Sequence, residues 1–335
     1  MRRLAVINQK GGVGKTTTAA NLGSAMGAAG RRVLLVDLDP QAHLTMCYGI
    51  EPGQGGEDKP NIYDVLTDSV PLGQAIVNVR PNVDIVPAYI DLAGAETELV
   101  NAVGREVILR DAISAVSESY DIALIDCPPS LGLLTINALV ASEEVLIPLQ
   151  AHFLALQGLS KLLDTVTLVK RRITPIIRIS GIVFCMFDGG TRLASEVVED
   201  VQQFLGASRN TDCAWSDARI YSTRIRRNIK LAESPSYGQT VHDYAPTSNG
   251  AADYNSLAGE IMAEWFGDQS APESADVVGE VQDEGSMPAG DVVTPLEAVT
   301  TVEAADSPAN PTEQAETTVL KTPRPAATTR TASTS

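Results

Sequence analysis

The sequence predicts an α/β fold built on a doubly wound, mainly parallel sheet. Short apolar runs alternate with segments of helical period, which is typical of parallel strands covered by helices on both faces. A glycine-rich turn follows the first apolar run, and aspartates follow three of the later ones. Because the carboxyl ends of parallel strands meet at one edge of such a sheet, we expect these polar residues to lie on the same edge.

The expected strands are short and rich in Val, Ile and Leu. They span residues 4–8, 33–37, 83–87, 122–126, 145–149 and 179–186. The first helix is expected at residues 15–28, ending at Gly30, since glycine commonly follows the last helical turn. Residues 257–266 have the spacing of an amphipathic helix that closes the domain. The three strand-end aspartates are Asp37, Asp126 and Asp188.

The composition changes sharply near residue 267. Residues 267–335 contain no Phe, Tyr or Trp and hold 12 acidic and 3 basic side chains. Such a segment cannot bury enough apolar surface to order itself, so we expect one domain at 1–266 and a disordered acidic tail at 267–335. The domain holds 22 basic and 30 acidic side chains. This acidic balance disfavours indiscriminate nucleic-acid binding but allows a local basic patch.

Cysteine usage and the N-terminal residues indicate a cytoplasmic protein. Cysteines 47, 127, 185 and 213 show no Cys-x-x-Cys spacing, so we expect reduced thiols. No signal peptide precedes the first strand, and no apolar run reaches the roughly 18 residues of a membrane span. We therefore expect no membrane partner.

Residues 10–17 read Lys-Gly-Gly-Val-Gly-Lys-Thr-Thr, between the first strand and the first helix. A glycine-rich turn at this place leaves backbone N–H groups free to bind phosphates at a helix N-terminus. Lys15 is placed to contact the β and γ phosphates, and the Thr16 hydroxyl can bind the Mg²⁺ that bridges them. The octet departs from the standard P-loop, because Gln9 replaces a glycine and Lys10 is an additional lysine.

The second lysine predicts a dimer. Because Lys15 serves the phosphates of its own site, Lys10 is available to the nucleotide of a second subunit, and in a two-fold dimer each Lys10 would cross. The octet resembles the deviant Walker A motif of the ParA/MinD family of ATPases, which have a SIMIBI-like P-loop NTPase fold. This resemblance implies the crossing role for Lys10. Gly11 and Gly12 would then lie where the subunits meet.

Acidic residues follow the second and fourth expected strands. Asp126 follows four apolar residues, which is the Walker B arrangement that holds Mg²⁺ through water. Asp39 is placed to orient or deprotonate the attacking water. The predicted metal ligands are therefore Thr16, Asp39 and Asp126, and the predicted catalytic residues are Lys10, Lys15 and Asp39. The alternative is that these aspartates only cap turns.

The resemblance to the ParA branch extends over residues 1–266. Further blocks at residues 61–66, 90–96, 128–135 and 227–236 look like those of Soj-type chromosome- and plasmid-partition ATPases. The resemblance implies an Mg²⁺-dependent ATPase whose ATP-bound homodimer binds nucleoid DNA without sequence preference and is stimulated by a ParB-type partner. A purine would lie between residues 186–188 and 227–228. The implied nucleotide-binding residues are Lys10, Gly11, Gly12, Val13, Gly14, Lys15, Thr16, Thr17, Met186, Asp188, Arg227 and Asn228.

Several positions depart from the family pattern. The segment resembling Asp-Gly-Arg-Thr-Asn places its basic residue two positions later, at Arg192. The usual Ile-Pro-Arg-Asn has Arg226 in place of proline, and the usual Arg-Ser-Arg-Gly loses both arginines at residues 247–250. His152 replaces a usual acidic residue, and Gln157 replaces a usual Glu. The nucleotide machinery is retained, whereas the surface expected to face DNA is rewritten.

A compensating basic cluster lies near the end of the expected domain. Five cations fall within twelve residues, and residues 170–172 add three more. Such clusters suit phosphate-backbone contacts, which carry no sequence information. The candidate DNA-binding residues are Arg192, Arg219, Arg224, Arg226, Arg227 and Lys230. The alternative is a solvated face with structural ion pairs.

Three other functions are alternatives to DNA segregation. A ParA-like ATPase that positions a protein cargo, such as a chemosensory cluster or a microcompartment, has no feature here that separates it from segregation. A MinD-like division-site regulator needs a C-terminal amphipathic helix, but residues 328–335 contain no aromatic anchor. An iron–sulfur reductase related to the nitrogenase iron protein needs paired bridging cysteines, and Cys127 has no matching second cysteine.

Overall fold

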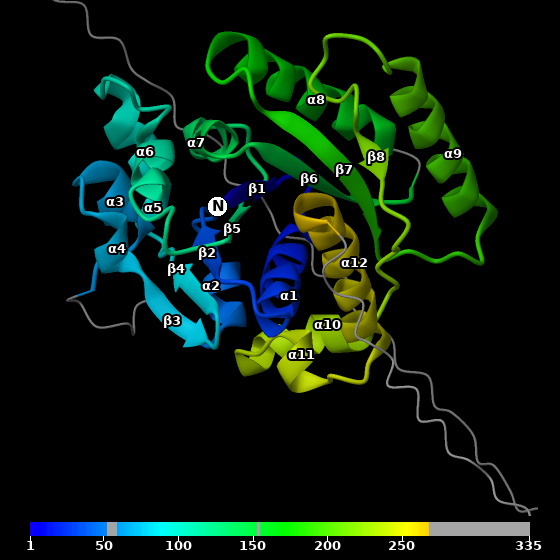
Figure 1. Ribbon diagram of the computed structural model, residues 1–335, viewed down its shortest axis with the longest axis horizontal. Coiled ribbons are helices and arrows are strands. Elements are labelled where there is room, and N and C mark those ends of the chain that lie inside the picture. Colours follow the sequence, from blue (N-terminus) through cyan, green and yellow to red (C-terminus); the bar gives the residue numbers. More distant parts are fainter. Residues whose placement is uncertain (52–58, 153–154, 268–335) are drawn as a thin grey trace, which may run out of the picture. The chain divides into compact units, whose positions relative to one another are not determined.

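The computed structural model describes residues 1–51, 59–152 and 155–267 (Figure 1). These residues form one eight-stranded sheet in the order β3-β4-β2-β5-β1-β6-β7-β8. The tail predicted at 267–335 lies, beyond Gly267, outside the described residues. The α/β fold with a mainly parallel sheet is confirmed.

All six predicted strands are present and pair in parallel. They are β1 (Arg2–Val6), β2 (Val33–Asp37), β4 (Val83–Val86), β5 (Ile122–Asp126), β6 (Glu144–Gln150) and β7 (Arg178–Cys185). Two edge strands were missed. The antiparallel β3 (Val77–Arg80) is mostly half-buried, and β8 (Arg219–Ile220) has only two residues, so neither forms a continuous apolar run.

Successive strand residues pack into two cores, one on each face of the sheet. Leu34 and Val36 contact one core and Val33 and Leu35 contact the other, because side chains alternate along a strand. The first face is covered by α3 (Ile62–Thr67), α4 (Leu72–Ala75), α5 (Leu92–Glu98), α6 (Ile108–Ser114), α7 (Leu133–Ala141), α8 (Ala155–Arg172) and α9 (Arg192–Ala207), with η1 (Leu99–Asn101) after α5.

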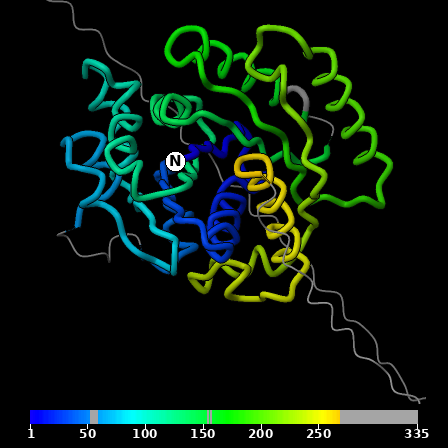
Figure 2. Tube along the Cα trace, viewed as in Figure 1, coloured from blue at the N-terminus to red at the C-terminus, as the bar shows by residue number. Residues whose placement is uncertain are grey.

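The second face is covered by α1 (Lys15–Ala28), α2 (His43–Cys47), α11 (Val241–Tyr244) and α12 (Asn249–Phe266), with α10 (Ile229–Glu233) and η2 (Ser234–Tyr237) near α11. The prediction for α1 is confirmed. The last helix begins at Asn249, well before residue 257, and the Ser248 hydroxyl caps its first turn by accepting from the Ala251 N–H. Figure 2 shows α12 (yellow) beside α1 (blue), and the two helices contact each other.

The four cysteines are unpaired, which agrees with the expectation of reduced thiols. Within the described ranges, none of the helices combines the length and apolar character of a membrane span.

One buried carboxylate joins the chain's N-terminus to its last described helix. The Glu144 side chain is 2% exposed and accepts hydrogen bonds from Arg2, from Arg178 at 3.1 Å and from Trp265 Nε1 at 3.2 Å. Burial of a carboxylate is unfavourable unless such partners surround it. Glu144 therefore holds β1, β7 and α12 to the start of β6.

We expect Glu144→Ala to lower the free energy of unfolding by about 3 kcal/mol, since it leaves partly buried cations without their acceptor. Urea denaturation followed by circular dichroism would measure the loss. The neighbouring Glu143 is a matched control, because its side chain is 29% exposed and bonds Arg3 at 3.0 Å. Glu143→Ala should lose about 1 kcal/mol or less, and equal losses in the two variants would contradict the role of Glu144.

Candidate functional site

The glycine-rich turn connects β1 to α1, and hydrogen bonds of the Asn8 side chain hold its start in place. The buried Asn8 side chain donates to the Pro148 carbonyl at 2.7 Å and accepts from the Lys10 N–H at 3.0 Å. Gly12 and Gly14 have φ angles of 71° and 95°, which disfavour residues other than glycine. Gly14 caps α1 without a side-chain hydrogen bond, so the first N–H groups of the helix are available to an anion.

The two lysines of the turn have different surroundings. Lys15 is 7% exposed, and its Nζ lies 3.5 Å from the Lys10 carbonyl, which is a long and weak contact. Lys10 is exposed, and its Nζ contacts Nε2 of His152 on the loop after β6. Lys15 is therefore held within its own site, while Lys10 contacts His152 at the surface.

Asp37 at the end of β2 is a structural residue. Its carboxylate is fully buried and accepts from the Thr45 N–H at 2.9 Å, the Thr45 hydroxyl at 2.8 Å and the Asp39 N–H at 3.1 Å. Burial raises the pKa of Asp37 to about 6. These bonds fix the turn that carries Asp39, whose own carboxylate accepts from the Gln41 N–H at 3.0 Å.

Asp126 at the end of β5 has no hydrogen-bond partner for either carboxylate oxygen among the described residues. Burial raises its pKa well above the ordinary value, with the neighbouring Asp37 charge adding to the effect and Thr16 and Lys15 opposing it. A buried carboxylate in this state is unfavourable, and a divalent cation would compensate it.

The donor set around Asp126 fits Mg²⁺, which favours carboxylate, hydroxyl, water and phosphate oxygens. Thr16 lies beside Asp126 and supplies a hydroxyl, and Asp39 lies close to both. No group of three His, Cys, Asp or Glu side chains in the described part of the chain could hold a metal ion. Mg²⁺ is usually bound by one or two carboxylates together with substrate phosphates and water.

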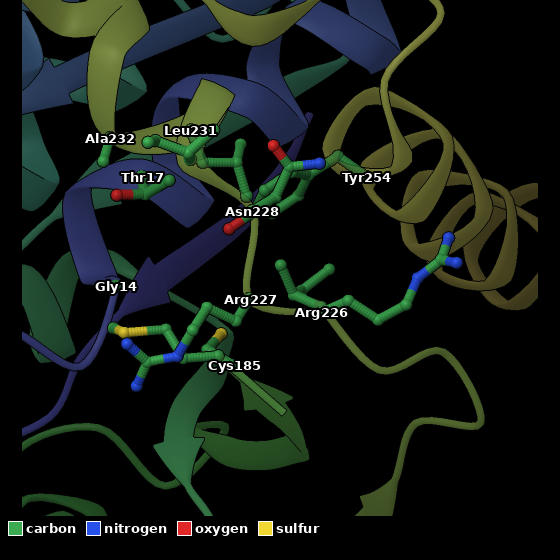
Figure 3. Close-up of a pocket in the computed structure, with 12 residues that line it drawn as sticks. Gly14, Thr17, Cys185, Arg226, Arg227, Asn228, Leu231, Ala232 and Tyr254 are labelled. Carbon is green, nitrogen blue, oxygen red and sulfur yellow. The ribbon is translucent and has the colours of Figure 1, made fainter. Parts of the chain in front are cut away.

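Two adjoining cavities lie along the carboxyl edge of the sheet. The P-loop cavity, of about 550 Å³, is lined by Gly11, Gly12, Gly14, Lys15, Thr16, Thr17, Asp39, Gln41, His43, Met46, Cys47, Pro129, Met186, Pro235 and Ser236. The apolar cavity, of about 420 Å³, is lined by Gly14, Thr17, Cys185, Met186, Ile225, Arg226, Arg227, Asn228, Ile229, Leu231, Ala232 and Tyr254 (Figure 3). The cavities share Gly14, Thr17 and Met186.

Met186 stands where the cavities meet and has an unusual backbone. Its φ of 50° is in the left-handed region, which is uncommon for a residue other than glycine. The Gln150 amide donates to the Met186 sulfur at 3.0 Å and to the Gly12 carbonyl at 3.1 Å. Met186 is therefore tied to the glycine-rich turn, and such backbone geometry is often found at functional sites.

The structure brings most of the predicted nucleotide residues to these cavities. Three of them do not line either one. Val13 is buried beneath the turn, Lys10 contacts His152, and Asp188 accepts from the Gly190 N–H at 3.2 Å in the turn before α9. Among the lining residues that sequence reasoning missed, Ile229 and Leu231 fall in a block already noted, whereas Tyr254 gave no sequence signal.

The predicted basic cluster is largely paired within the chain. Ion pairs join Arg192 to Glu196, Arg219 to Glu264, Arg226 to Asp253 and Lys230 to Glu233. Arg224 donates to the Tyr221 carbonyl and lies over the rings of Phe184 and Phe187. Arg227 lines the apolar cavity. Because paired cations project a weaker positive field, the assignment of these residues to DNA stays a prediction.

Comparisons with known proteins agree with this site. A family model described as an AAA domain matches residues 1–179. The sporulation initiation inhibitor protein Soj of Bacillus subtilis is 45% identical over 261 residues, which cover 78% of this chain and 98% of Soj. The chromosome-partitioning protein ParA of Caulobacter vibrioides is 40% identical over 266 residues, which cover 78% of this chain and 94% of ParA.

Solved structures of similar fold include nucleotide-binding proteins. Cobyrinic acid a,c-diamide synthase from Mycobacterium smegmatis, with a bound ATP analog and magnesium, superimposes with a TM-score of 0.66 at 35% identity. That alignment covers 79% of this chain and 96% of the synthase. The cell division ATPase MinD of Pyrococcus furiosus has a TM-score of 0.62 at 26% identity, covering 79% of this chain and all of MinD.

Proposed function

Since this chain belongs to the Soj/ParA family of chromosome-partitioning ATPases, we propose that it is an ATP-dependent dimerising switch that segregates DNA. The chain is an ATPase of this family and uses ATP and Mg²⁺. The observation that carries the proposal is the pair of adjoining cavities with the unpartnered Asp126 buried beside Thr16. The folded ATPase domain would span residues 1–266, followed by the acidic tail.

The two cavities would hold different parts of the nucleotide. The phosphates would lie on the N–H groups of the glycine-rich turn, with Lys15 compensating their charge. The purine would lie in the apolar cavity between Met186 and Arg227. Mg²⁺, held by Thr16 and by Asp126 through water, would neutralise charge on the phosphates. Asp39, on the wall of the P-loop cavity, would accept a proton from the attacking water.

The partners in this proposal are a second copy of the chain, a ParB-type protein and nucleoid DNA. ATP would close the dimer, and the closed dimer would bind DNA without sequence preference. The ParB-type partner would then stimulate hydrolysis and release. The protein would accordingly be cytoplasmic and associated with the nucleoid.

DNA binding is tested by fluorescence anisotropy with random-sequence duplex DNA, in ATP and in ADP, at two salt concentrations. We expect binding that requires ATP and weakens steeply with salt, because phosphate contacts release counterions. Absence of binding in both states would overturn the DNA part of the proposal. ATP hydrolysis would then serve a protein cargo.

The dimer makes a separate prediction at Gly11. A Cβ built at Gly11 meets nothing within 4 Å in the single chain, so a larger side chain fits the subunit by itself. We expect Gly11→Val to bind nucleotide but to remain monomeric in ATP, because the valine would collide with the second subunit. Light scattering after size exclusion would measure the mass.

Gly206 on α9 is the matched control, since a Cβ there also meets nothing within 4 Å. Gly206→Val should still double its mass in ATP. A doubling of mass by Gly11→Val would place the dimer contact elsewhere on the surface.

A further inference from the structure

The segment from β8 to the apolar cavity, residues 219–228, is held along α12 by three carboxylates. We call this segment the strap. Glu264 contacts Arg219, Glu260 accepts from the N–H groups of Ser222 at 2.9 Å and Thr223 at 2.7 Å, and Asp253 holds Arg226. The strap therefore runs antiparallel to α12, with an acidic anchor at its start, middle and end.

The last of these anchors is the most complete. Asp253 accepts from the Arg226 backbone N–H at 2.9 Å, from Nε at 3.1 Å and from Nη2 at 2.6 Å. The Asp253 side chain is 9% exposed, and that of Arg226 is 51% exposed. Bidentate bonds between a guanidinium and a carboxylate are among the strongest and most directional in proteins. This contact fixes both the backbone and the side chain of Arg226.

The helix that carries Asp253 packs against α1, the helix that begins at the glycine-rich turn. The next residue, Tyr254, lines the apolar cavity, and its hydroxyl lies 3.2 Å from that of Thr18 on α1. α12 is therefore connected to the P-loop through α1. Asp253 in turn attaches the end of the strap to α12.

The sheet holds the strap as far as Ile225. Past β8 the Tyr221 N–H donates to the Ile182 carbonyl at 3.0 Å, the Ile225 N–H to the Phe184 carbonyl at 2.9 Å, and the Phe187 N–H to the Ile225 carbonyl at 2.9 Å. The bridge between Phe187 and Arg226 ends this pairing, so Asp253 acts where the sheet contacts stop. Arg226 is not a proline, so no ring restricts its backbone, and its N–H is available to Asp253.

We propose that Asp253 is a positioning residue for the nucleoside part of ATP, an inference that rests on the proposed function. By fixing Arg226, it sets where Arg227 and Asn228 stand on the apolar cavity. Figure 3 shows the Arg226 and Arg227 side chains extending in opposite directions, so that Arg226 can be clamped while Arg227 lines the cavity.

The test is Asp253→Ala, with affinity for Mg-ADP and for inorganic pyrophosphate measured by isothermal titration calorimetry. We expect about a tenfold weaker affinity for Mg-ADP, the size of effect that loss of a charged hydrogen-bond set produces. Pyrophosphate affinity should stay within about twofold, because it engages the glycine-rich turn without a base. In steady-state hydrolysis, KM should rise more than kcat falls.

A second change distinguishes positioning from general damage. Arg226→Pro in the Asp253→Ala background should recover most of the lost Mg-ADP affinity, since the ring restores the backbone restriction. Asp200→Ala, which removes an exposed aspartate from α9, is the matched control and should bind like the wild type. If Asp253→Ala folds poorly, Asp253→Asn keeps the volume and one acceptor, and about a threefold loss is expected.

Two results would overturn the clamp. One is unchanged Mg-ADP affinity in Asp253→Ala. The other is an equal loss of Mg-ADP and pyrophosphate affinity, which would indicate displaced packing of α12. A wild-type protein that binds neither ligand would instead overturn the proposed function, so the two failures are distinguishable.

Discussion

Replacement of Asp39 by alanine is expected to slow ATP hydrolysis about 100-fold or more while ATP binding is retained. Asp39 lines the P-loop cavity and is 7% exposed, whereas Asp37 and Asp126 are fully buried. Among these three acids, Asp39 is therefore the one that can reach a water at the end of the phosphates. Without it the ATP-bound dimer should accumulate, which phosphate release and light scattering would measure together.

A second variant separates proton acceptance from support of the turn. Asp39→Asn keeps an oxygen for the Gln41 N–H but carries no charge. If Asp39 is the general base, the two variants should be similarly slow. Recovery of turnover by the asparagine would show that the turn matters and the charge does not, and rapid turnover by both would remove Asp39 from the mechanism.

The parts of the site that are local in sequence could be predicted from it. The glycine-rich turn with Lys15 and the strand-end acids each lie within a few residues of the strand they follow, and buried strands such as β2 and β5 are apolar up to their final aspartate. The structural role of Asp37 could not be predicted, because Thr45 brings its hydroxyl to Asp37 only in the folded chain.

The start of α12 was missed for a similar reason. Asn249 and Gly250 favour a turn when the sequence is considered locally. In the structure a Cβ at Gly250 would lie 2.8 Å from a side-chain carbon of Leu231 on α10, so a larger residue would force the Leu231 side chain to shift. Gly250, whose small size suits its packing against Leu231, thus made the start of α12 look like a turn in the sequence.

The basic cluster shows how a count of cations can overstate a surface field. Its acceptors Asp253 and Glu264 lie far along the chain, on a helix whose acidic residues look like an ordinary solvated face. Only the fold places them against Arg226 and Arg219. Salt dependence of DNA binding is therefore the informative measurement, because its slope reports how many phosphates are contacted.

Lys10 carries the second large prediction. We expect Lys10→Ala to abolish the hydrolysis that a ParB-type partner stimulates, a loss of about 10³-fold, which is the size of effect of a cation supplied by a second subunit. Nucleotide affinity of the single subunit should change little, because Lys15 and not Lys10 lines the P-loop cavity. Lys161→Ala on α8, which removes an exposed lysine, should keep full stimulation.

A mixing experiment tests whether Lys10 acts across the dimer. Lys15→Ala subunits would lack phosphate binding of their own but would still offer Lys10 to a partner. When they are mixed equally with Lys10→Ala subunits, half of the dimers should be mixed, each with one complete site, so about a quarter of the wild-type stimulated rate should return. In the structure Lys10 contacts His152 of its own chain, and it must leave this contact to cross. If stimulated hydrolysis is not recovered although the mixed dimers form, Lys10 acts within its own subunit. It would then act from the position in which it contacts His152.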